Sequence, residues 1–374
     1  MRGLGPGAFA VFGLSRTWRE RLSREALRRL ALGLIVGALG GAVADHFGVP
    51  LAWMLGALFA CMAASLARLP VDVPNWVRGG FLWVIGLFLG ESFSAASAEQ
   101  MARWPATLLL AALYVPIGAA LCYALFRRAA GWGRGTALLA GLPGGVTAVA
   151  VFALEMGGDE RRVALAQSLR VAIVVLAAPL IAFGWLGLPE PTAETYAAAR
   201  PMTLAEAALL IPAALAGSWA AARMRAPIPW FLGPVLASAA LRLGGLVEGT
   251  LPPLLVEAAL VVSGASIGAR FRGTPLRLFA DVALWAGLGT ALLMALSLGM
   301  AAVVAPVFGV DWFAALLAFA PGGVAEMSLI AIAIGADPAF VAAHHLARIF
   351  AVLFALPIMA PWLSRVLAED PGGP

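Results

Sequence analysis

Long apolar stretches separated by short polar turns dominate this chain and predict its elements. They lie at about residues 30 to 47, 50 to 67, 78 to 97, 105 to 127 and 162 to 187, and again at about 204 to 222, 227 to 244, 252 to 269, 278 to 305 and 340 to 364. A helix of about 20 apolar residues spans the hydrocarbon core of a bilayer. The pattern therefore predicts ten membrane-spanning helices, with interrupted apolar segments at 134 to 157 and 312 to 335.

Each interrupted segment carries the sequence Pro-Gly-Gly. The motifs are Pro143-Gly144-Gly145 and Pro321-Gly322-Gly323. Proline removes a backbone donor and glycine weakens a helix, so each run should break into two half-helices. An opened backbone in hydrocarbon leaves N–H and C=O groups unpaired, at roughly several kcal/mol each, and survives only against protein or a water-filled cavity. Two such breaks at matching places are typical of the binding site of a secondary transporter, although each motif can also be only a tight hairpin tip.

The matching places arise from an internal duplication. The offset between the motifs, Pro321 minus Pro143, is 178, and the same offset pairs Gly86 with Gly264, Gly90 with Gly268, Asp159 with Asp337, Arg170 with Arg348 and Pro179 with Pro357. An offset of 177 pairs Pro50, Trp53 and Gly56 with Pro227, Trp230 and Gly233. Low-complexity sequence does not reproduce Trp, Pro and Arg at constant spacing. We therefore predict two homologous repeats, 30–187 and 204–366, joined by a loop at 188–203.

Few residues lie outside the repeats. Within residues 1–29, Leu14, Trp18 and Leu22 fall on one side and arginines elsewhere, as in a helix that lies in the membrane interface. Its basic character places this amphipathic helix in the cytoplasm, and the tail at 367–374 is expected on the same side. The start of the chain lacks the apolar core and cleavage site of a signal peptide, so we expect none to be removed.

Composition agrees with a membrane location. Of the 374 residues 62% are hydrophobic, and the mean hydropathy is +0.93, whereas a soluble domain is roughly 45–50% apolar. All 25 basic residues are arginine, so the net charge of +5 is a topology signal and predicts no nucleic-acid partner. Cys61 and Cys122 lie in apolar runs and are expected to act as small hydrophobes.

The arginines favour interrupted segments that enter and leave the membrane on one side. In that arrangement each repeat has five crossings, the repeats are inverted, and the cytoplasmic ends collect most of the arginines. If both segments cross fully, the acidic loop at 190–200 falls inside and Arg161 and Arg162 fall outside. The positive-inside rule therefore favours re-entrant hairpins and a cytoplasmic N-terminus.

The paired motifs and the helices that follow them resemble the duplicated membrane protein family called AbrB. These helices read AQSLRVAIVVLAAPLI and AHHLARIFAVLFALPIM. The resemblance covers nearly the whole chain and implies a place among the cation/proton antiporters and anion transporters, with inverted repeats, broken helices at mid-membrane and a homodimer. The family also carries the labels ammonia monooxygenase and regulator of gene expression, and it shares its name with a small soluble DNA-binding protein that this chain does not resemble.

Two arginines are expected deep in the membrane. Arg170 and Arg348 sit about eight or nine residues into apolar runs, on the order of 12 Å below the interface. Gln167 and His345 precede them by one helical turn on the same face. Intramembrane charge marks an ion or substrate path. Two other interpretations stay open, namely snorkelling to the interface and pairing with the carbonyl groups of the hairpins.

Glu326 is the candidate for ion coupling. It lies three residues after Gly323, where the first repeat has Ala148. A desolvated carboxyl that gains and loses a proton or cation suits such a site. A permanent ion pair with Arg348, or capping of the half-helix, is the alternative. Thr147 and Ser328 would add hydroxyl ligands.

The histidines do not predict a metal centre. His344 and His345 are adjacent, and neighbouring residues of a helix point about 100° apart, so they cannot share an ion without help. A copper oxygenase needs several convergent imidazoles, and this chain has three histidines in all. We therefore predict no metal, no cofactor and no enzymatic activity.

These observations predict an all-α polytopic protein of a bacterial-type inner membrane, with two inverted repeats of about five spanning helices and one re-entrant or broken segment each. The expected function is secondary transport of a small anionic or carboxylate solute coupled to H⁺ or Na⁺. The substrate site is predicted to comprise Pro143, Gly144, Gly145, Thr147, Gln167, Arg170, Pro321, Gly322, Gly323, Ser328, His345 and Arg348, with Glu326 as the coupling residue. The alternative is a membrane sensor that affects gene expression without transport. A sensor needs an output surface, and only the N-terminal segment offers one in the cytoplasm.

Overall fold

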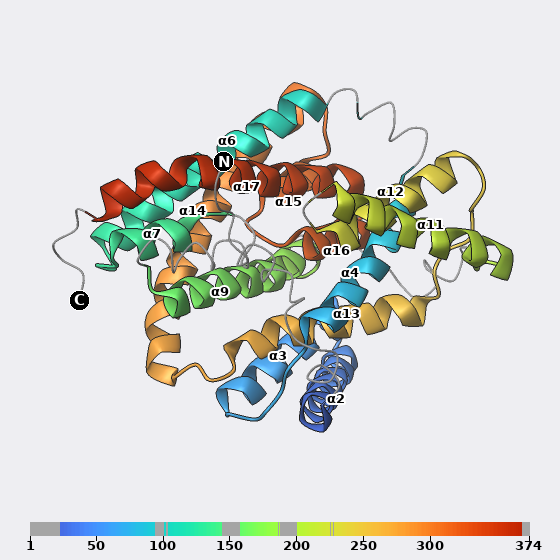
Figure 1. Ribbon diagram of the computed structural model, residues 1–374, viewed down its shortest axis with the longest axis horizontal. Helices are drawn as coiled ribbons and strands as arrows, with labels where there is room; N and C mark the ends of the chain where they lie inside the picture. The colour runs from blue at the N-terminus through green and yellow to red at the C-terminus, as the bar shows by residue number, and fades with distance from the viewer. Residues whose placement is uncertain are drawn as a thin grey trace.

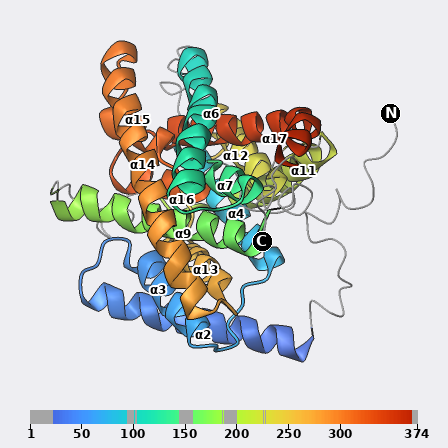
Figure 2. The same ribbon diagram turned by 90° about the vertical axis from the view of Figure 1, so that its left-hand side faces the viewer.

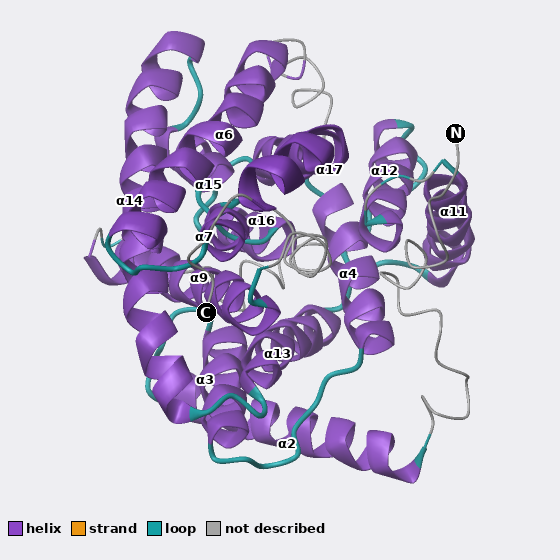
Figure 3. Cartoon of the chain, turned by 60° about the vertical axis from the view of Figure 1, so that its left-hand side comes forward, coloured by secondary structure: helices purple, strands orange, loops and turns teal. Residues whose placement is uncertain are grey.

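The computed structural model describes residues 23–93, 101, 104–143, 158–185, 187, 200–224, 226 and 228–368. Within these residues all the long elements are helices and the extended backbone is limited to one isolated bridge, Pro201 with Thr250 (Figure 3). Gly144, Gly145 and Thr147 lie outside the described residues, as do most of the N-terminal segment and of the loop at 188–203. The chain is an all-α polytopic membrane protein, as predicted.

The order of the helices follows the predicted order of the apolar runs. The first repeat contains α2 (Arg24–His46), α3 (Ala52–Leu66), α4 (Asn75–Gly90), α6 (Trp104–Arg128), α7 (Arg134–Gly141) and α9 (Glu160–Pro179), which continues as a π-helix, η2 (Leu180–Trp185). The second contains α11 (Leu204–Arg223), α12 (Pro229–Leu243), α13 (Pro253–Gly268), the 3₁₀ turn η3 (Ala269–Phe271), α14 (Leu276–Phe308), α15 (Trp312–Phe319), α16 (Val324–Ala333) and α17 (Pro338–Ala368). Ser23 caps α2, so the basic residues from Arg24 onward belong to the first spanning helix.

Seven of the described helical segments are long and apolar enough to cross a membrane: α2, α6, α9 with η2, α11, α13 with η3, α14 and the described apolar part of α17. The predicted spans at 50 to 67, 78 to 97 and 227 to 244 are shorter in the structure, because α3, α4 and α12 have only 15, 16 and 15 residues. In Figure 1, α2 and α3 lie at one edge of the molecule and α6 and α17 at the opposite edge, with α9, α13 and α16 between them.

Glycines let helices of different repeats pack backbone against backbone. A Cβ added to Gly264 of α13 would lie 2.1 Å from the Met54 carbonyl oxygen of α3, and one on Gly86 of α4 would lie 2.6 Å from the Phe231 carbonyl oxygen of α12. Small residues at such contacts are how helices associate in a membrane, where lipid gives no hydrophobic driving force. The two contacts are equivalent, because in both of them the third helix of one repeat packs against the second helix of the other repeat.

The equivalent helices α6 and α14 run in opposite directions. Tyr114 of α6 donates its hydroxyl hydrogen to the Leu293 carbonyl oxygen of α14 at 3.2 Å, and Cys122, further along α6, contacts the earlier residue Gly289 at 3.7 Å. The helices α6 and α14 are therefore antiparallel, and they lie side by side in Figures 2 and 3. A twofold axis perpendicular to the helices relates antiparallel partners, which is the geometry that inverted repeats require.

The duplication extends to strained backbone. Leu51 and Ile228, which are 177 residues apart, are the N-cap residues of α3 and α12 and have φ angles of 49° and 47°. This left-handed conformation is uncommon for any residue with a Cβ and rarest for a β-branched one such as isoleucine. Its recurrence at equivalent positions indicates that both repeats make the same sharp turn after a proline.

In each repeat the helix before the break and the long helix that follows the interrupted segment start at the same end. The backbone N–H of Asp159, just before α9, donates to the Thr136 hydroxyl in the first turn of α7 at 2.9 Å. Further along, Gln167 contacts Leu139 and Arg170 contacts Leu142, so α7 and α9 start together and run parallel. In the second repeat His345 contacts Leu317 and Arg348 contacts Ala320, which gives the same relation between α15 and α17.

We expect Gly264→Ala to lower the thermal stability of the detergent-purified protein, because the added Cβ would force α13 away from α3. Overpacking of this kind costs roughly 1–3 kcal/mol. Gly287→Ala in α14 is the matched control, since nothing lies within 4 Å of a Cβ there, and this change should leave the midpoint equal or higher. Equal midpoints for both variants would contradict the close α3–α13 contact.

Candidate functional site

Two buried side chains cap the end of α7. Gln167 donates its amide hydrogens to the carbonyl oxygens of Leu139 at 2.8 Å and Leu142 at 3.0 Å. Arg170 donates to the Leu142 oxygen at 2.8 Å and to the Gln167 side-chain oxygen at 2.5 Å. The last carbonyls of a helix have no intrahelical partner, and the dipole makes that end negative. A guanidinium group suits such a helix end, because it donates hydrogen bonds to the unpaired carbonyl groups and its positive charge offsets the negative end of the dipole.

The second repeat repeats this cap at the end of α15. Arg348 donates to the Ala320 carbonyl oxygen at 2.6 Å, and His345 donates from Nε2 to the Leu317 carbonyl oxygen at 2.9 Å. The offset of 178 relates the bond from Gln167 to Leu139 to the bond from His345 to Leu317, and the bond from Arg170 to Leu142 to the bond from Arg348 to Ala320. The sequence left two alternatives to an ion or substrate path open for these arginines, namely snorkelling and pairing with hairpin carbonyl groups. In the structure, Arg170 and Arg348 pair with hairpin carbonyl groups.

The caps are buried and leave hydrogen-bonding capacity unused. Arg170 is 6% exposed and Arg348 is 3% exposed. Among the described residues, the buried Nε atom of each arginine has no hydrogen-bond partner. Within this part of the chain, each guanidinium group therefore keeps one donor that its cap does not use.

Tyr114 is a residue of this site that the sequence reasoning missed. Its ring lies 5.1 Å from the guanidinium carbon of Arg348, in cation–π geometry, and its hydroxyl is 3.2 Å from that of Ser297. The Ser297 hydroxyl lies 2.9 Å from the Phe319 carbonyl oxygen at the end of α15. A tyrosine in the middle of an apolar run was the available signal, because a buried phenol usually needs a partner.

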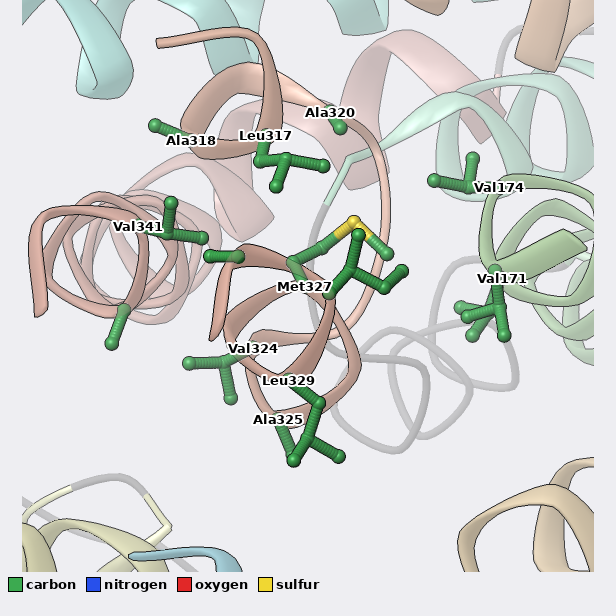
Figure 4. Close-up of a cluster of buried hydrophobic side chains, with 14 of the residues drawn as sticks. Val171, Val174, Leu317, Ala318, Ala320, Val324, Ala325, Met327, Leu329 and Val341 are labelled. Atoms are coloured by element: carbon green, nitrogen blue, oxygen red, sulfur yellow. The ribbon is translucent and has the colours of Figure 1, made fainter. Parts of the chain in front are cut away.

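The glycines of the second motif make room for side chains of α16. A Cβ on Gly322 would lie 2.8 Å from Met327, and one on Gly323 would lie 2.1 Å from a carboxylate oxygen of Glu326. Figure 4 shows Met327 between α15 and α16, with Leu317 and Ala320 beside it and Val171 and Val174 of α9 across from it. Pro321 and Pro143 are buried at the corresponding breaks. Gly323 has an ordinary negative φ of −86°, so glycine suits this position through the space it leaves for Glu326 and not through its backbone conformation.

Glu326 lies in the first turn of α16 and folds back over its N-terminus. It is 8% exposed, and Ser263 of α13 donates its hydroxyl hydrogen to Oε1 at 3.4 Å. The N-cap residue of α16 is Gly323, which has no side chain that could bond the first N–H groups of the helix, and the Glu326 carboxyl group lies beside this residue. Among the described residues no cation lies within ion-pair distance of Glu326, because Arg348 is directed at the end of α15.

Ser328, a predicted site residue, is engaged within its own helix. Its hydroxyl donates to the Val324 carbonyl oxygen at 2.7 Å inside α16. Two residues outside the predicted site also have partners. His344 uses both ring nitrogens, on the Phe340 carbonyl oxygen at 2.7 Å and on the Thr107 hydroxyl at 2.9 Å, and Arg270, which follows α13, interacts electrostatically with Glu326. Within the described residues no three His, Cys, Asp or Glu side chains gather as they would around a metal ion.

Comparison with known proteins gives one family and two relatives. The model of the family described as "Transition state regulatory protein AbrB" matches residues 53–364. The chain is 27% identical over 353 residues to "Uncharacterized protein YhjN" of Bacillus subtilis, covering 87% of this chain and 90% of that one. It is 28% identical over 337 residues to "Putative regulator AbrB" of Escherichia coli, covering 87% of this chain and 92% of that one. No solved structure matches.

We expect both Arg170→Met and Arg348→Met to destabilise the protein, and Arg348→Met to do so more. In the first variant Gln167 still bonds the Leu142 carbonyl oxygen, whereas in the second the Ala320 carbonyl oxygen loses its side-chain donor. An unsatisfied buried acceptor costs roughly 1–3 kcal/mol. Thermal unfolding in detergent measures the loss, and Arg128→Met, at an exposed position at the end of α6, is the control. Midpoints equal to that of the control would show that the arginines do not hold the hairpin ends.

We also expect Gly323→Ala to displace Glu326, because the new Cβ would occupy the place of its carboxylate oxygen. The destabilisation should shrink when Glu326→Ala is already present. A double-mutant cycle measures this coupling, which for contacting residues is roughly 0.5–3 kcal/mol. Additive effects would mean that the carboxyl group does not fold back over the N-terminus of α16.

Proposed function

The chain belongs to the AbrB family, and we propose that it is an ion-coupled secondary transporter of a small anionic solute such as a carboxylate. The observation that carries the proposal is a difference between the two kinds of helix end at the hairpins. Buried side chains cap the C-terminal ends of α7 and α15. At the N-terminal end of α16 the N-cap residue is Gly323, which has no side chain to act as a cap, and Glu326 lies next to it.

An anion suits the uncapped end of α16. The first N–H groups of a helix and the positive end of its dipole attract negative charge. The unpartnered Nε atoms of Arg170 and Arg348 add donors near the two hairpin ends. In the proposal, Gly322, Gly323 and these side chains form the substrate site together with the first Pro-Gly-Gly segment, in which Gly144, Gly145 and Thr147 stay predictions.

Glu326 couples the anion to a cation by competing for the same place. When ionised, its carboxylate lies over the N-terminus of α16 and repels an incoming anion. A proton, or Na⁺ held with the Ser263 hydroxyl, neutralises Glu326 and removes this repulsion. Anion and cation then occupy the site together, which is the thermodynamic requirement for symport.

The arrangement of the helices supports alternating access. The hairpin of the first repeat opens at the end that carries Arg134, Arg161 and Arg162, and the hairpin of the second repeat opens at the opposite end. With the arginine-rich end in the cytoplasm, the repeats are inverted and the hairpins meet near the midplane from both sides. In the proposal the protein lies in the inner membrane with its N-terminus in the cytoplasm. The homodimer implied by the resemblance stays a prediction.

A membrane sensor that affects gene expression is the second candidate, favoured by the printed names of the family and of the Escherichia coli relative. It would bind the same ligand and hold one conformation. The proposal assigns no catalytic step to the protein. It therefore does not include the oxidation of ammonia that the family label ammonia monooxygenase implies.

A thermal-shift screen of the purified protein identifies the ligand class. The screen uses monocarboxylates, dicarboxylates, amino acids and inorganic anions at pH 5.5 and 7.5, with and without sodium. A ligand at 100 times its dissociation constant stabilises the folded state by about 2.7 kcal/mol. We expect one anion class to raise the midpoint, and to do so more at the lower pH or with sodium.

Uptake into proteoliposomes then separates transport from sensing. The wild type should take up the labelled anion along an imposed proton or sodium gradient, and Glu326→Gln should still bind the anion but lose dependence on the gradient. Ser328→Ala is the control, because its hydroxyl bonds only within α16. Binding without uptake by the wild type would favour the sensor, and a gradient response unchanged in Glu326→Gln would remove Glu326 from the coupling mechanism.

A further inference from the structure

A cavity of about 390 Å³ lies among arginines at the ends of several helices. Its lining comes from both repeats: Arg29 of α2, the turn Arg68-Leu69-Pro70 after α3, and the turn Arg272-Gly273-Thr274-Pro275 before α14. Three of the eight lining residues are arginines and none is acidic. The volume is in the range of small-molecule sites, roughly 300–1,000 Å³.

Arg68 occupies a backbone position that the other repeat gives to glycine. The ends of α3 and α12 form the same Schellman turn, with hydrogen bonds from Leu69 to Ala64 and from Leu246 to Leu241. The left-handed residue is Arg68 in the first turn, with φ of 64°, and Gly245 in the second, with φ of 67°. A side chain adopts this conformation only against steric strain. Gly245 adopts the same conformation without this strain, because glycine has no Cβ. In the first repeat the strained residue is Arg68, which lines the cavity.

The charge of the cavity is only partly compensated. Arg29 is paired with Glu25, and Arg272 lies 3.5 Å from Asp72, an exposed pair with modest energy. Arg68 has no ion pair among the described residues. Several arginines around one cavity suit a phosphate group, because guanidinium groups bind its oxygens through two hydrogen bonds at once.

We propose that this cavity binds the headgroup of an anionic phospholipid. The lipid source of the phosphate is favoured by the surroundings: the cavity lies at the ends of two candidate spans, α2 and α14. Apolar side chains flank it, with Leu69 46% exposed and Leu276 65% exposed, and they could contact the acyl chains of a bound lipid. Basic pockets between spanning helices at the cytoplasmic side are a recurrent form of lipid recognition. The bound lipid would join the two repeats at this end.

The test uses the full chain in detergent and Arg68→Gly. Glycine relieves the left-handed strain, so the lipid-free variant should unfold at the same temperature as the wild type or higher. Native mass spectrometry with phosphatidylglycerol should show affinity reduced by roughly tenfold, the share of one charge-assisted hydrogen bond. Phosphatidylcholine should bind neither protein. Arg277→Gln removes an equal charge from the same face outside the cavity and should bind phosphatidylglycerol as the wild type does.

Each other outcome overturns the proposal. Unchanged affinity in Arg68→Gly, or an equal loss in Arg277→Gln, would mean that lipid meets only a diffuse basic surface. Inorganic phosphate that displaces phosphatidylglycerol at comparable concentration would assign the cavity to a soluble ligand. Arg68→Asn repeats the test if the glycine variant is poorly expressed, because asparagine also tolerates the left-handed conformation.

Discussion

The structure depends on what satisfies a broken helix inside a membrane protein. The half-helix α15 ends at Phe319, far from solvent, and its last carbonyl oxygens are bonded by Arg348 and His345. Without these donors the break would leave acceptors unpaired in a medium that cannot hydrate them. The arginines are therefore tolerated at depth because they neutralise a helix end, and the helix end is tolerated because the arginines are there.

The duplication produces two capped helix ends, one in each repeat, and helices of the two repeats pack against each other. Equivalent helices α6 and α14 pack antiparallel, and Tyr114 of α6 reaches both α14 and the guanidinium of Arg348. Glycines at the contacts of α3 with α13 and of α4 with α12 let each repeat complete the other. Neither repeat buries its own third helix alone, so the hairpins are held by an interface that includes both halves of the chain.

Function enters where the repeats differ. Arg170 and Arg348 are equivalent and make equivalent bonds, whereas Glu326 corresponds to Ala148 and Arg68 to Gly245. The arginines that both repeats keep bond the carbonyl groups at the break in the backbone, which is present in both repeats. Residues that only one repeat carries break the symmetry, and they place a carboxyl group at the uncapped end of α16 and an arginine in a cavity at the ends of several helices.

The sequence by itself determined the fold class, the duplication and the order of the helices, because apolar length and a constant offset are local patterns that need no partner. It also placed Arg170 and Arg348 among apolar residues, but it left their partners open. Only the tertiary structure decided that they bond hairpin carbonyls, that Tyr114 and Ser263 join the site, and that the helices before and after each interrupted segment start at the same end. These facts depend on distances between residues far apart in the chain, such as Ser263 and Glu326, which no local pattern encodes.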